Sequence, residues 1–462
     1  MNRFFLFVLS LSCSFNLHSN AFVENKHTEE IIYKVIGECE DITLNSSIYP
    51  YPLSRVYDSV LLSKCEETEE ILKFLNKKAL NSKISIGYQT HSNDLYFQDS
   101  SERLYKHDHS FINLETFNKN KSARLKIRRL DNKYVYDDSY FSIFRDNKSF
   151  TVGKMSHWWS FSPETSLALS NASRPFPSAT IENLIPHKID WLSFLGPVNY
   201  KFLLGKLEDD RSIPNAKFLG FKARFYPSNK FSWSVSRTAQ YGGRGRPESL
   251  ESLINLIIGR DNRNDSGIKR ESEPGNQMAT LELNLFPNGI NDYVLYTQIS
   301  GQDEAGYLPS RIIYNLGATK IFKNPDRAIF NIDYTNTETK NRPNYSYNHF
   351  LYLDGWRYLN MPIGASIDAD SSALSISYSK VFSNENSLKF KFLKADINKN
   401  NSEKNYIFEN NFKVNSFIID YSKNFNDRFL LRLITNIDDN NPFQDDKFSI
   451  KTSVSMEYFF KN

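Results

Sequence analysis

The fold is decided by the last stretch of the chain, SIKTSVSMEYFF at Ser449–Phe460. Successive side chains of a β-strand point to opposite faces. One face of this stretch carries Ile450, Thr452, Val454, Met456, Tyr458 and Phe460, and the other carries Ser449, Lys451, Ser453, Ser455 and Glu457. The pattern predicts an amphipathic strand that ends close to an aromatic residue.

The same alternation recurs upstream, from residue 83 onwards. Apolar and polar residues alternate at 84–88, 219–225, 231–236, 281–285 and 388–392. A period of two indicates half-buried strands. We therefore predict that residues 83–462 form an all-β domain.

Two architectures use such strands: a soluble β-sandwich, and an outer-membrane β-barrel whose apolar face meets lipid. The composition includes 36 Phe and 26 Tyr with a mean hydropathy of −0.51. Aromatic residues near strand ends, an amphipathic last strand and an export signal favour the barrel. Its length predicts about 18 antiparallel strands, with 16 or 20 as alternatives.

Composition also excludes several other classes of protein. An aromatic content of 15% is too high for a disordered chain. No apolar run of 18 residues follows residue 21, which excludes membrane-spanning helices from the mature chain. The formal net charge of +4 gives no reason to expect nucleic acid as a partner.

Residues 1–21 are predicted to be a secretory signal peptide. Arg3 supplies the positive charge, residues 4–11 the apolar core, and Ser19 and Ala21 the small residues of a cleavage site after Ala21. A lipoprotein acylated at Cys13 is the alternative, although Ser10 stands where such a site has leucine. The signal predicts an outer-membrane location in a Gram-negative bacterium.

Residues 22–82 have a helix-like apolar spacing and are predicted to form a small periplasmic helical segment. They contain Cys39 and Cys65, the two cysteines left after signal removal. In an oxidising compartment these predict a structural disulfide, with free thiols as the alternative. Their spacing fits neither a zinc site nor a redox motif.

The middle of the chain carries a series of distinctive motifs. They are HWW at 157–159, LSNASRP at 169–175, LEDDRSIPNAK at 207–217, SRTAQYGGRGRP at 236–247, GRDN at 259–262, EPGNQ at 273–277, GQDEAGYLPS at 301–310, YLDGWRY at 352–358 and PIG at 362–364. In this order, over about residues 150–380, they resemble the Wzi family of outer-membrane capsule assembly proteins. The resemblance implies an 18-stranded barrel with a small periplasmic helical bundle. It also implies a lectin-like role in holding capsular polysaccharide.

The residue types in these motifs suit a glycan ligand. Arginine pairs bidentately with the carboxylate of a uronic acid, and aromatic rings offer flat faces to sugar rings. The candidates for polysaccharide binding are Trp158, Trp159, Arg174, Arg237, Gln240, Arg244, Arg246, Asn276 and Gln277. The two tryptophans have an alternative place in the interfacial aromatic belt.

Charged residues in the same motifs favour an ion-pair network in the lumen. They are Glu208, Asp209, Asp210, Arg211, Asp303 and Glu304. Inward charges need partners whatever the function of the barrel, because an unpaired buried charge is costly. Asp303 and Glu304 lack the oxygen count of a calcium site, so neither a metal nor a cofactor is expected.

Together these observations predict a non-enzymatic protein that binds capsular or related surface polysaccharide and helps to assemble or retain it. Its expected partners are that polysaccharide, outer-membrane lipid and other export components. No catalytic motif such as Gly-x-Ser-x-Gly occurs, which leaves a lipid or glycan hydrolase as a minor alternative. The main alternative is a porin-like diffusion channel for small solutes.

Overall fold

The computed structural model describes most of the barrel domain and a few residues before it. The described residues are 22–23, 47–53, 56, 83–91, 97–101, 103–105, 107–118, 120–258, 273, 275–287, 293–302, 304–305, 308–309, 311–322, 328–339, 343–382, 386–401, 405, 408–426, 428–440 and 448–460. The predicted signal peptide, Cys39, Cys65 and most of the predicted helical segment lie outside them.

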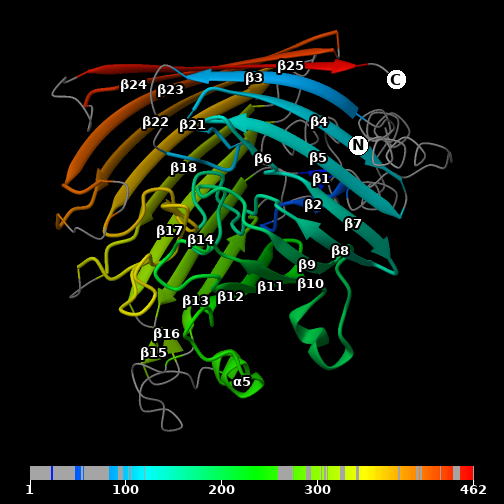
Figure 1. The fold of residues 1–462 in the computed structure, drawn as a ribbon, viewed down its shortest axis with the longest axis vertical. Helices are drawn as coiled ribbons and strands as arrows, with labels where there is room; N and C mark the ends of the chain where they lie inside the picture. The colour runs from blue at the N-terminus through cyan, green and yellow to red at the C-terminus, as the bar shows by residue number, and fades with distance from the viewer. Residues whose placement is uncertain are drawn as a thin grey trace.

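Eighteen antiparallel strands form a closed barrel (Figure 1). They are β3 (Lys83–His91), β4 (His109–Phe117), β5 (Lys121–Leu130), β7 (Tyr140–Arg145), β8 (Lys148–Gly153), β9 (Ser178–Asn183), β10 (Val198–Lys206), β11 (Lys217–Ser228), β12 (Phe231–Tyr241), β13 (Gly275–Leu285), β14 (Tyr293–Gln302), β17 (Ile312–Phe322), β18 (Ala328–Asn336), β21 (Ser372–Val381), β22 (Ser387–Ile397), β23 (Phe412–Phe425), β24 (Phe429–Asp438) and β25 (Ser449–Phe460). A short β6 (Lys133–Val135) extends β5 as a hairpin. The predicted all-β fold with about 18 strands is confirmed.

The barrel closes where β25 pairs with β3, with Met456 opposite Tyr88. Every pairing around the described ring is antiparallel, which requires an even number of strands for closure. The last predicted strand coincides with β25 at both ends.

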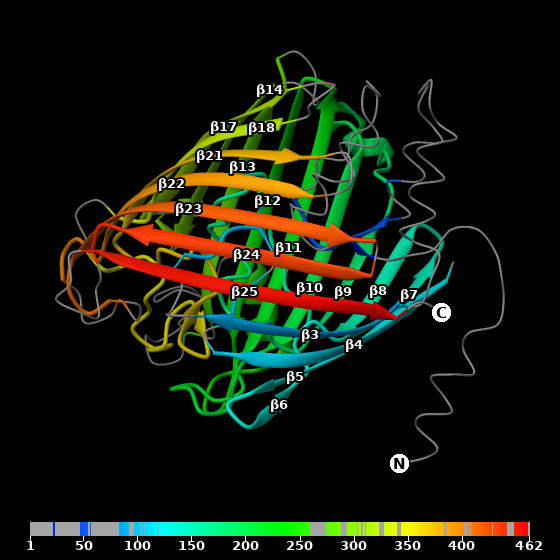
Figure 2. The ribbon, with the colours of Figure 1, turned by 90° about the horizontal axis from the view of Figure 1, so that it is seen from above.

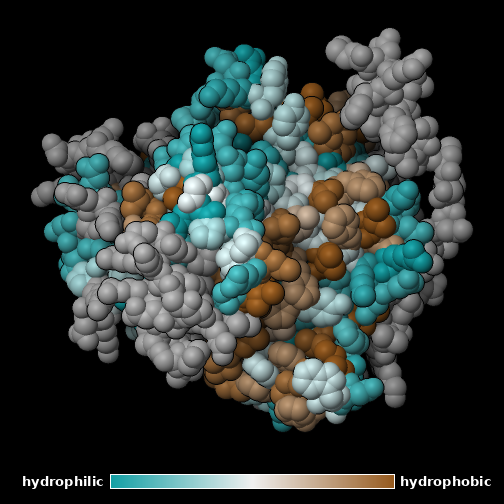
Figure 3. All heavy atoms as spheres, turned by 60° about the horizontal axis from the view of Figure 1, so that its bottom comes forward, coloured by the Kyte–Doolittle hydropathy of each residue, from teal (hydrophilic) through white to brown (hydrophobic). Residues whose placement is uncertain are grey.

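Burial in the barrel is inverted relative to a soluble protein. On β25, Ile450 and Met456 are 53% and 43% exposed, whereas Lys451 has no exposed surface. Figure 3 shows apolar side chains gathered over the middle of one outer face, with hydrophilic side chains on both sides. An apolar outside and a polar inside are the pattern of a membrane barrel, so the sandwich alternative is wrong.

The two ends of the barrel differ in their connections. At one end, called the short-turn end, strands join through turns such as 146–147 and 229–230. At the other, called the long-loop end, the connections include residues 154–177 and 337–371. Figure 2 shows the barrel from the side, with the yellow long-loop segment at the left and the C-terminus at the right.

Two helical segments of the described part of the chain lie outside the ring of strands. The 3-10 helix η1 (Asp190–Leu195) belongs to the β9–β10 connection at the short-turn end and contacts β11. The α-helix α5 (Leu250–Ile258) follows β12 at the long-loop end and lies next to the ends of β12 and β13 (Figure 1). No helix among the described residues is both long and apolar enough to cross a bilayer.

Candidate functional site

Two connections from the long-loop end fold back into the barrel and fill its lumen. Their described parts, residues 154–177 and 343–371, are together called the plug. They are joined by backbone and side-chain hydrogen bonds, among them one from Trp356 Nε1 to the carbonyl of Ala168 at 2.8 Å. The buried core of the plug includes Leu167, Leu169, Tyr347, Tyr352, Trp356, Ile363 and Ile367.

A row of buried amides anchors the plug to the barrel wall. Gln240 donates to the carbonyl of Gly355 at 2.7 Å and accepts from Asn276 at 3.2 Å. Asn276 accepts from Gln302 at 3.1 Å, and Gln302 also donates to the carbonyl of Asn348 at 3.0 Å. These amides come from neighbouring strands β12, β13 and β14, so one sector of the wall holds the plug.

Two arginines fix the turn of the plug around Gly355. Arg211 donates to the carbonyls of Gly355 and Arg357 at 3.3 and 3.2 Å. Arg357 forms a bidentate, fully buried ion pair with Asp368 at 2.9 and 2.7 Å. Gly355 has a φ of +64°, and a Cβ there would lie 2.1 Å from the carbonyl oxygen of Tyr347. Only glycine fits this turn without displacing the backbone.

Both candidate tryptophans lie inside the barrel, so their alternative placement in the interfacial belt is wrong. Trp158 Nε1 donates to the carbonyl of Ser162 at 2.9 Å. Trp159 is 1% exposed and packs directly over Gly220 of β11, where there is no side chain. Its carbonyl accepts from Lys222 at 3.0 Å. Both residues therefore contribute to the plug and its support.

Residues 47–53, close to the N-terminus, also lie against the inner wall. Lys201 donates to the carbonyl of Pro50, and Lys222 to the carbonyl of Ser47, each at 3.0 Å. Each lysine is also paired with a buried carboxylate at 3.4 Å, Glu182 for Lys201 and Glu282 for Lys222. Neither pair is predicted from the sequence.

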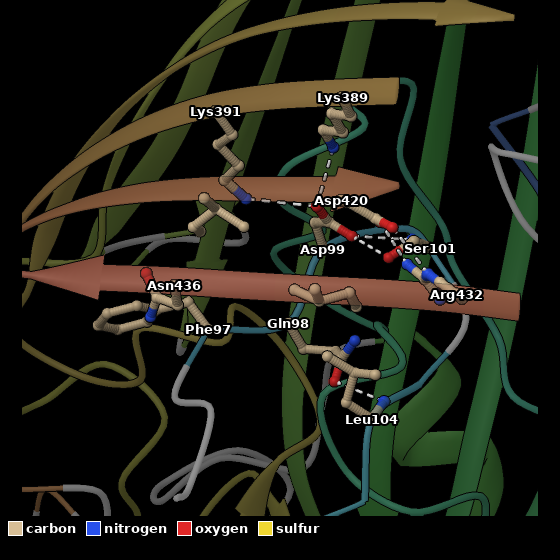
Figure 4. A pocket seen from close by; sticks show the side chains of 12 residues that line it. Phe97, Gln98, Asp99, Ser101, Leu104, Lys389, Lys391, Asp420, Arg432 and Asn436 are labelled. Carbon is tan, nitrogen blue, oxygen red and sulfur yellow. Dashed lines mark hydrogen bonds and ion pairs between the residues drawn. The ribbon is translucent and has the colours of Figure 1, made fainter. Parts of the chain in front are cut away.

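A cluster of four charges joins the plug to a second sector of the wall. Lys389 of β22 lies 2.9 Å from Asp99, and Lys391 lies 3.3 Å from the same carboxylate (Figure 4). Lys391 also contacts Glu164 of the plug. Burial opposes ionisation of both carboxyl groups, but the two lysines outweigh it and lower the pKa of Asp99 and of Glu164.

Three of these charged residues, Asp99, Lys389 and Lys391, line a small cavity of about 50 Å³. Its walls are Phe97, Gln98, Asp99, Ser101, Leu104, Lys389, Lys391, Ile418, Asp420, Arg432, Ile434 and Asn436. Arg432 and Asp420 form a bidentate pair at its edge, at 3.0 and 2.6 Å. A cavity of this size has room for one or two water molecules and is too small for a sugar ring.

Arg174 lies in the plug and is partly exposed. It holds Asp137 with two hydrogen bonds, at 2.6 and 3.1 Å. Burial opposes its charge, but the bonds and charge of Asp137 outweigh this and raise the pKa of Arg174. Burial raises the pKa of neighbouring Tyr358 to about 12, so the tyrosine is a neutral hydroxyl here.

The remaining arginine candidates lie on the outer wall or at the long-loop end. Arg237 is on the outward face of β12, where it donates to Gln277 at 2.8 Å and to the carbonyl of Ile257 in α5 at 3.0 Å. Arg244 is exposed at the long-loop end, and Arg246 is half-buried beside it. The nine candidates thus fall into separate groups instead of one pocket.

The acidic motif at 208–211 lies at the long-loop end. Glu208 pairs with Arg211 at 3.2 Å and accepts from the backbone of Leu359 at 3.1 Å. Asp209 and Asp210 are exposed. Two carboxylates of this motif therefore face solvent at the end of the barrel.

The described residues contain no cluster of three or more His, Cys, Asp or Glu side chains that could hold a metal ion. Asp303 and the side chain of Glu304 lie outside them. Ser156 donates to Asp138 at 3.2 Å, and the His157 ring makes no side-chain pair with it. Burial and the charge of Lys201 hold the pKa of His157 well below its usual value.

Comparisons with known proteins identify the family. The family described as "Capsule assembly protein Wzi" matches residues 79–450. The chain belongs to the capsule assembly protein Wzi family. The predicted resemblance over about residues 150–380 is thereby confirmed, and it extends over nearly the whole barrel of this Wzi family member.

Two known proteins are similar to this chain. A Klebsiella pneumoniae protein described as an uncharacterized 55.8 kDa protein in the cps region is 32% identical over 169 residues, which cover 36% of this chain. The match spans about a third of that relative's length, 32%. The solved Escherichia coli Wzi, an outer-membrane protein described as involved in group 1 capsule assembly and as a carbohydrate-binding β-barrel, shares the fold. The TM-score is 0.82 at 20% identity, over 96% of this chain and 100% of the other.

Proposed function

We propose that this Wzi family member binds capsular or a related surface polysaccharide at its long-loop end and helps to assemble or retain it at the cell surface. This role requires only that the protein bind the polymer, and it involves no breaking or forming of bonds in the polysaccharide. In outer-membrane barrels the longer loops face the exterior and the short turns face the periplasm. We accordingly assign the long-loop end to the outside of the cell.

The observation that carries the proposal is the plug. A diffusion channel needs an aqueous path along its axis, but here residues 154–177 and 343–371 pack into a buried core tied to several strands. The long-loop end is therefore a fixed surface and not the mouth of a pore. A fixed surface loses little conformational entropy when a polymer binds to it.

The predicted binding residues take two roles in this proposal. Trp158, Trp159, Gln240 and Asn276 are buried and position the surface from below. Arg244 is exposed and able to meet a polymer directly, as are Asp209 and Asp210 of the neighbouring loop. Arginine suits the carboxylate of an acidic sugar, and the aspartates suit sugar hydroxyls.

The test compares a deletion strain with its parent for cell-attached and released surface polysaccharide. The strain is complemented with wild-type protein, with Arg244→Ala or with Arg145→Ala. Arg145 is a matched control, because it is also exposed but lies beside the 146–147 turn at the short-turn end. We expect unchanged total polymer, with more of it released from the deletion and Arg244→Ala strains than from the other two.

Two results would contradict the proposal at different levels. If the deletion strain keeps its polymer attached, the assembly and retention role is wrong. If it releases polymer but Arg244→Ala retains it fully, the role stands and Arg244 is not a contact. Binding of the purified proteins to the purified polymer, measured by calorimetry, separates a loss of contact from a loss of protein in the membrane.

A further inference from the structure

The helix α5 lies on the outer wall of the barrel, on the side that faces the membrane. Its residues Leu253 and Leu256 pack against Leu219, Ala239 and Tyr241 of β11 and β12. The side chains of these strand residues point away from the lumen, because they alternate with buried inward residues such as Gln240.

Hydrogen bonds hold the helix at both of its ends. Tyr241 donates to the carbonyl of Ser249, just before the helix, at 3.0 Å. Arg237 donates to the carbonyl of Ile257, near its other end, at 3.0 Å. The helix therefore runs along β12 from the level of Tyr241 to the level of Arg237.

That direction takes α5 from the rim towards the middle of the membrane. Arg237 and Tyr241 are four residues apart on one strand, which corresponds to about 10 Å along the barrel axis for a strand tilted by about 40°. The apolar band of an outer-membrane barrel is about 25 Å tall. The last turn of α5 lies level with Arg237, one outward position from the exposed apolar Val235, and so reaches the edge of that band.

The apolar surface of α5 is wider than its contact with the wall. Successive residues of an α-helix are about 100° apart, so positions 250, 254 and 257 share one flank beside the wall-facing positions. Leu250, Ile254 and Ile257 are 73%, 48% and 60% exposed. The opposite flank carries Glu251 and Asn255.

The exposed flank continues the lipid-facing surface of the barrel. Below Arg237 on the same outer face, Val235 of β12 stands opposite Leu281 of β13, and each is 37% exposed. The flank itself carries no polar residue. Arg237 and Gln277, the polar residues of the wall beside it, are hydrogen-bonded to each other, and Arg237 also to α5.

We propose that α5 is embedded in the outer leaflet of the membrane, with Leu250, Ile254 and Ile257 in contact with lipid acyl chains. The partner is lipid, because an apolar flank that is continuous with the barrel's lipid-facing wall offers no hydrogen-bonding groups to a polysaccharide. Interfacial helices bind membranes through such apolar faces, with their polar faces turned to water. Here the helix anchors the β12–β13 connection at a fixed depth beside the surface proposed to bind glycan.

Site-directed spin labelling tests this placement in the full-length protein. Ile254→Cys and Ile257→Cys are made separately in a Cys39→Ser, Cys65→Ser background, labelled with a nitroxide and reconstituted into phosphatidylcholine–phosphatidylglycerol vesicles. Asn255→Cys, on the polar flank of the same helix, is the matched control. Collision rates with oxygen, which concentrates in lipid, and with a water-soluble nickel chelate are then compared.

We expect the ratio of oxygen to nickel collisions at positions 254 and 257 to exceed the ratio at 255 several-fold. Ratios equal to that of the control would place the flank in water and overturn the proposal. Spin–spin broadening would instead identify a second copy on the flank, and protection of the labels by added polysaccharide would identify a glycan. Either result would also overturn it. The proposal is independent of the retention role, since vesicles without polysaccharide suffice.

Discussion

Replacing Trp356 by alanine is expected to open the barrel without unfolding it. Trp356 has no exposed surface, packs edge-on against Phe218 of β11 at 5.2 Å between ring centroids, and donates to the carbonyl of Ala168 at 2.8 Å. It thereby connects both halves of the plug to the wall.

The magnitude follows from these contacts. Truncating a buried tryptophan to alanine costs about 3–5 kcal/mol, a range that includes the cavity left behind. An equilibrium constant changes tenfold for about every 1.4 kcal/mol. A loss of about 4 kcal/mol therefore raises the undocked fraction of the plug about 1,000-fold. The barrel strands keep their interstrand hydrogen bonds, because Trp356 does not belong to any of these strands.

Conductance across planar bilayers measures the outcome. We expect a closed wild-type protein and discrete opening events in Trp356→Ala, while circular dichroism shows an unchanged β-content. Trp191→Ala is the control, since Trp191 is 77% exposed and lies at the short-turn end, away from the loops that form the plug. Steady porin-like conductance of the wild type, or a folded Trp356→Ala protein that stays closed, would refute the reasoning.

Three further predictions concern charge, pH and lipid. Lys222→Met leaves Glu282 buried without its lysine and should lower the free energy of unfolding by about 3–5 kcal/mol. The double variant that adds Glu282→Gln should recover part of this loss. Equal stabilities of the wild type and the variants in denaturant titrations would argue against a coupled pair. The pKa values of Asp99 and Glu164 are lowered, so their contribution to plug docking is complete above the ordinary carboxyl pKa values of 3.8 and 4.5 and is lost as the pH falls below them. Opening events should therefore increase below about pH 4. Brominated lipids should quench a large part of the fluorescence of Trp191, whose side chain is exposed. This quenching should be absent from the Trp191→Phe variant. A wild-type protein whose fluorescence is not quenched would place η1 in water.

The strands could be predicted from the sequence because their period of two reflects a local physical constraint. Each strand has lipid on one side and lumen on the other, so residues such as Ile450 and Lys451 alternate along the chain itself. The lysines of β22 likewise fall on the polar face that the alternation predicts. Their partners could not be predicted in this way, because Asp99 lies 290 residues from Lys389 and meets it only through closure of the barrel.

The candidate site was harder to predict for a related reason. Segments 154–177 and 343–371 have little regular secondary structure and hence no period that marks their inner side. Trp158 and Gln240 resemble exposed binding residues in sequence, yet burial makes them supports of the plug. The position of Arg237 under α5 could not be predicted either, because it depends on a contact between the helix and β12 that the alternation along the strand does not indicate.

The seam between β3 and β25 has a consequence for biogenesis. It joins the first and last strands of the ring, so it is the last pairing for which both partners exist during synthesis. Residues 47–53 accept hydrogen bonds from the inner wall through their backbone, and the plug forms a buried ion pair with it. If the seam closed first, both segments would have to enter the finished barrel through one of its ends. We therefore expect the lumen contents to dock on an open sheet. A disulfide that locks Tyr88→Cys to Met456→Cys early in assembly should trap an empty, conducting barrel, whereas the same lock applied after folding should leave it closed.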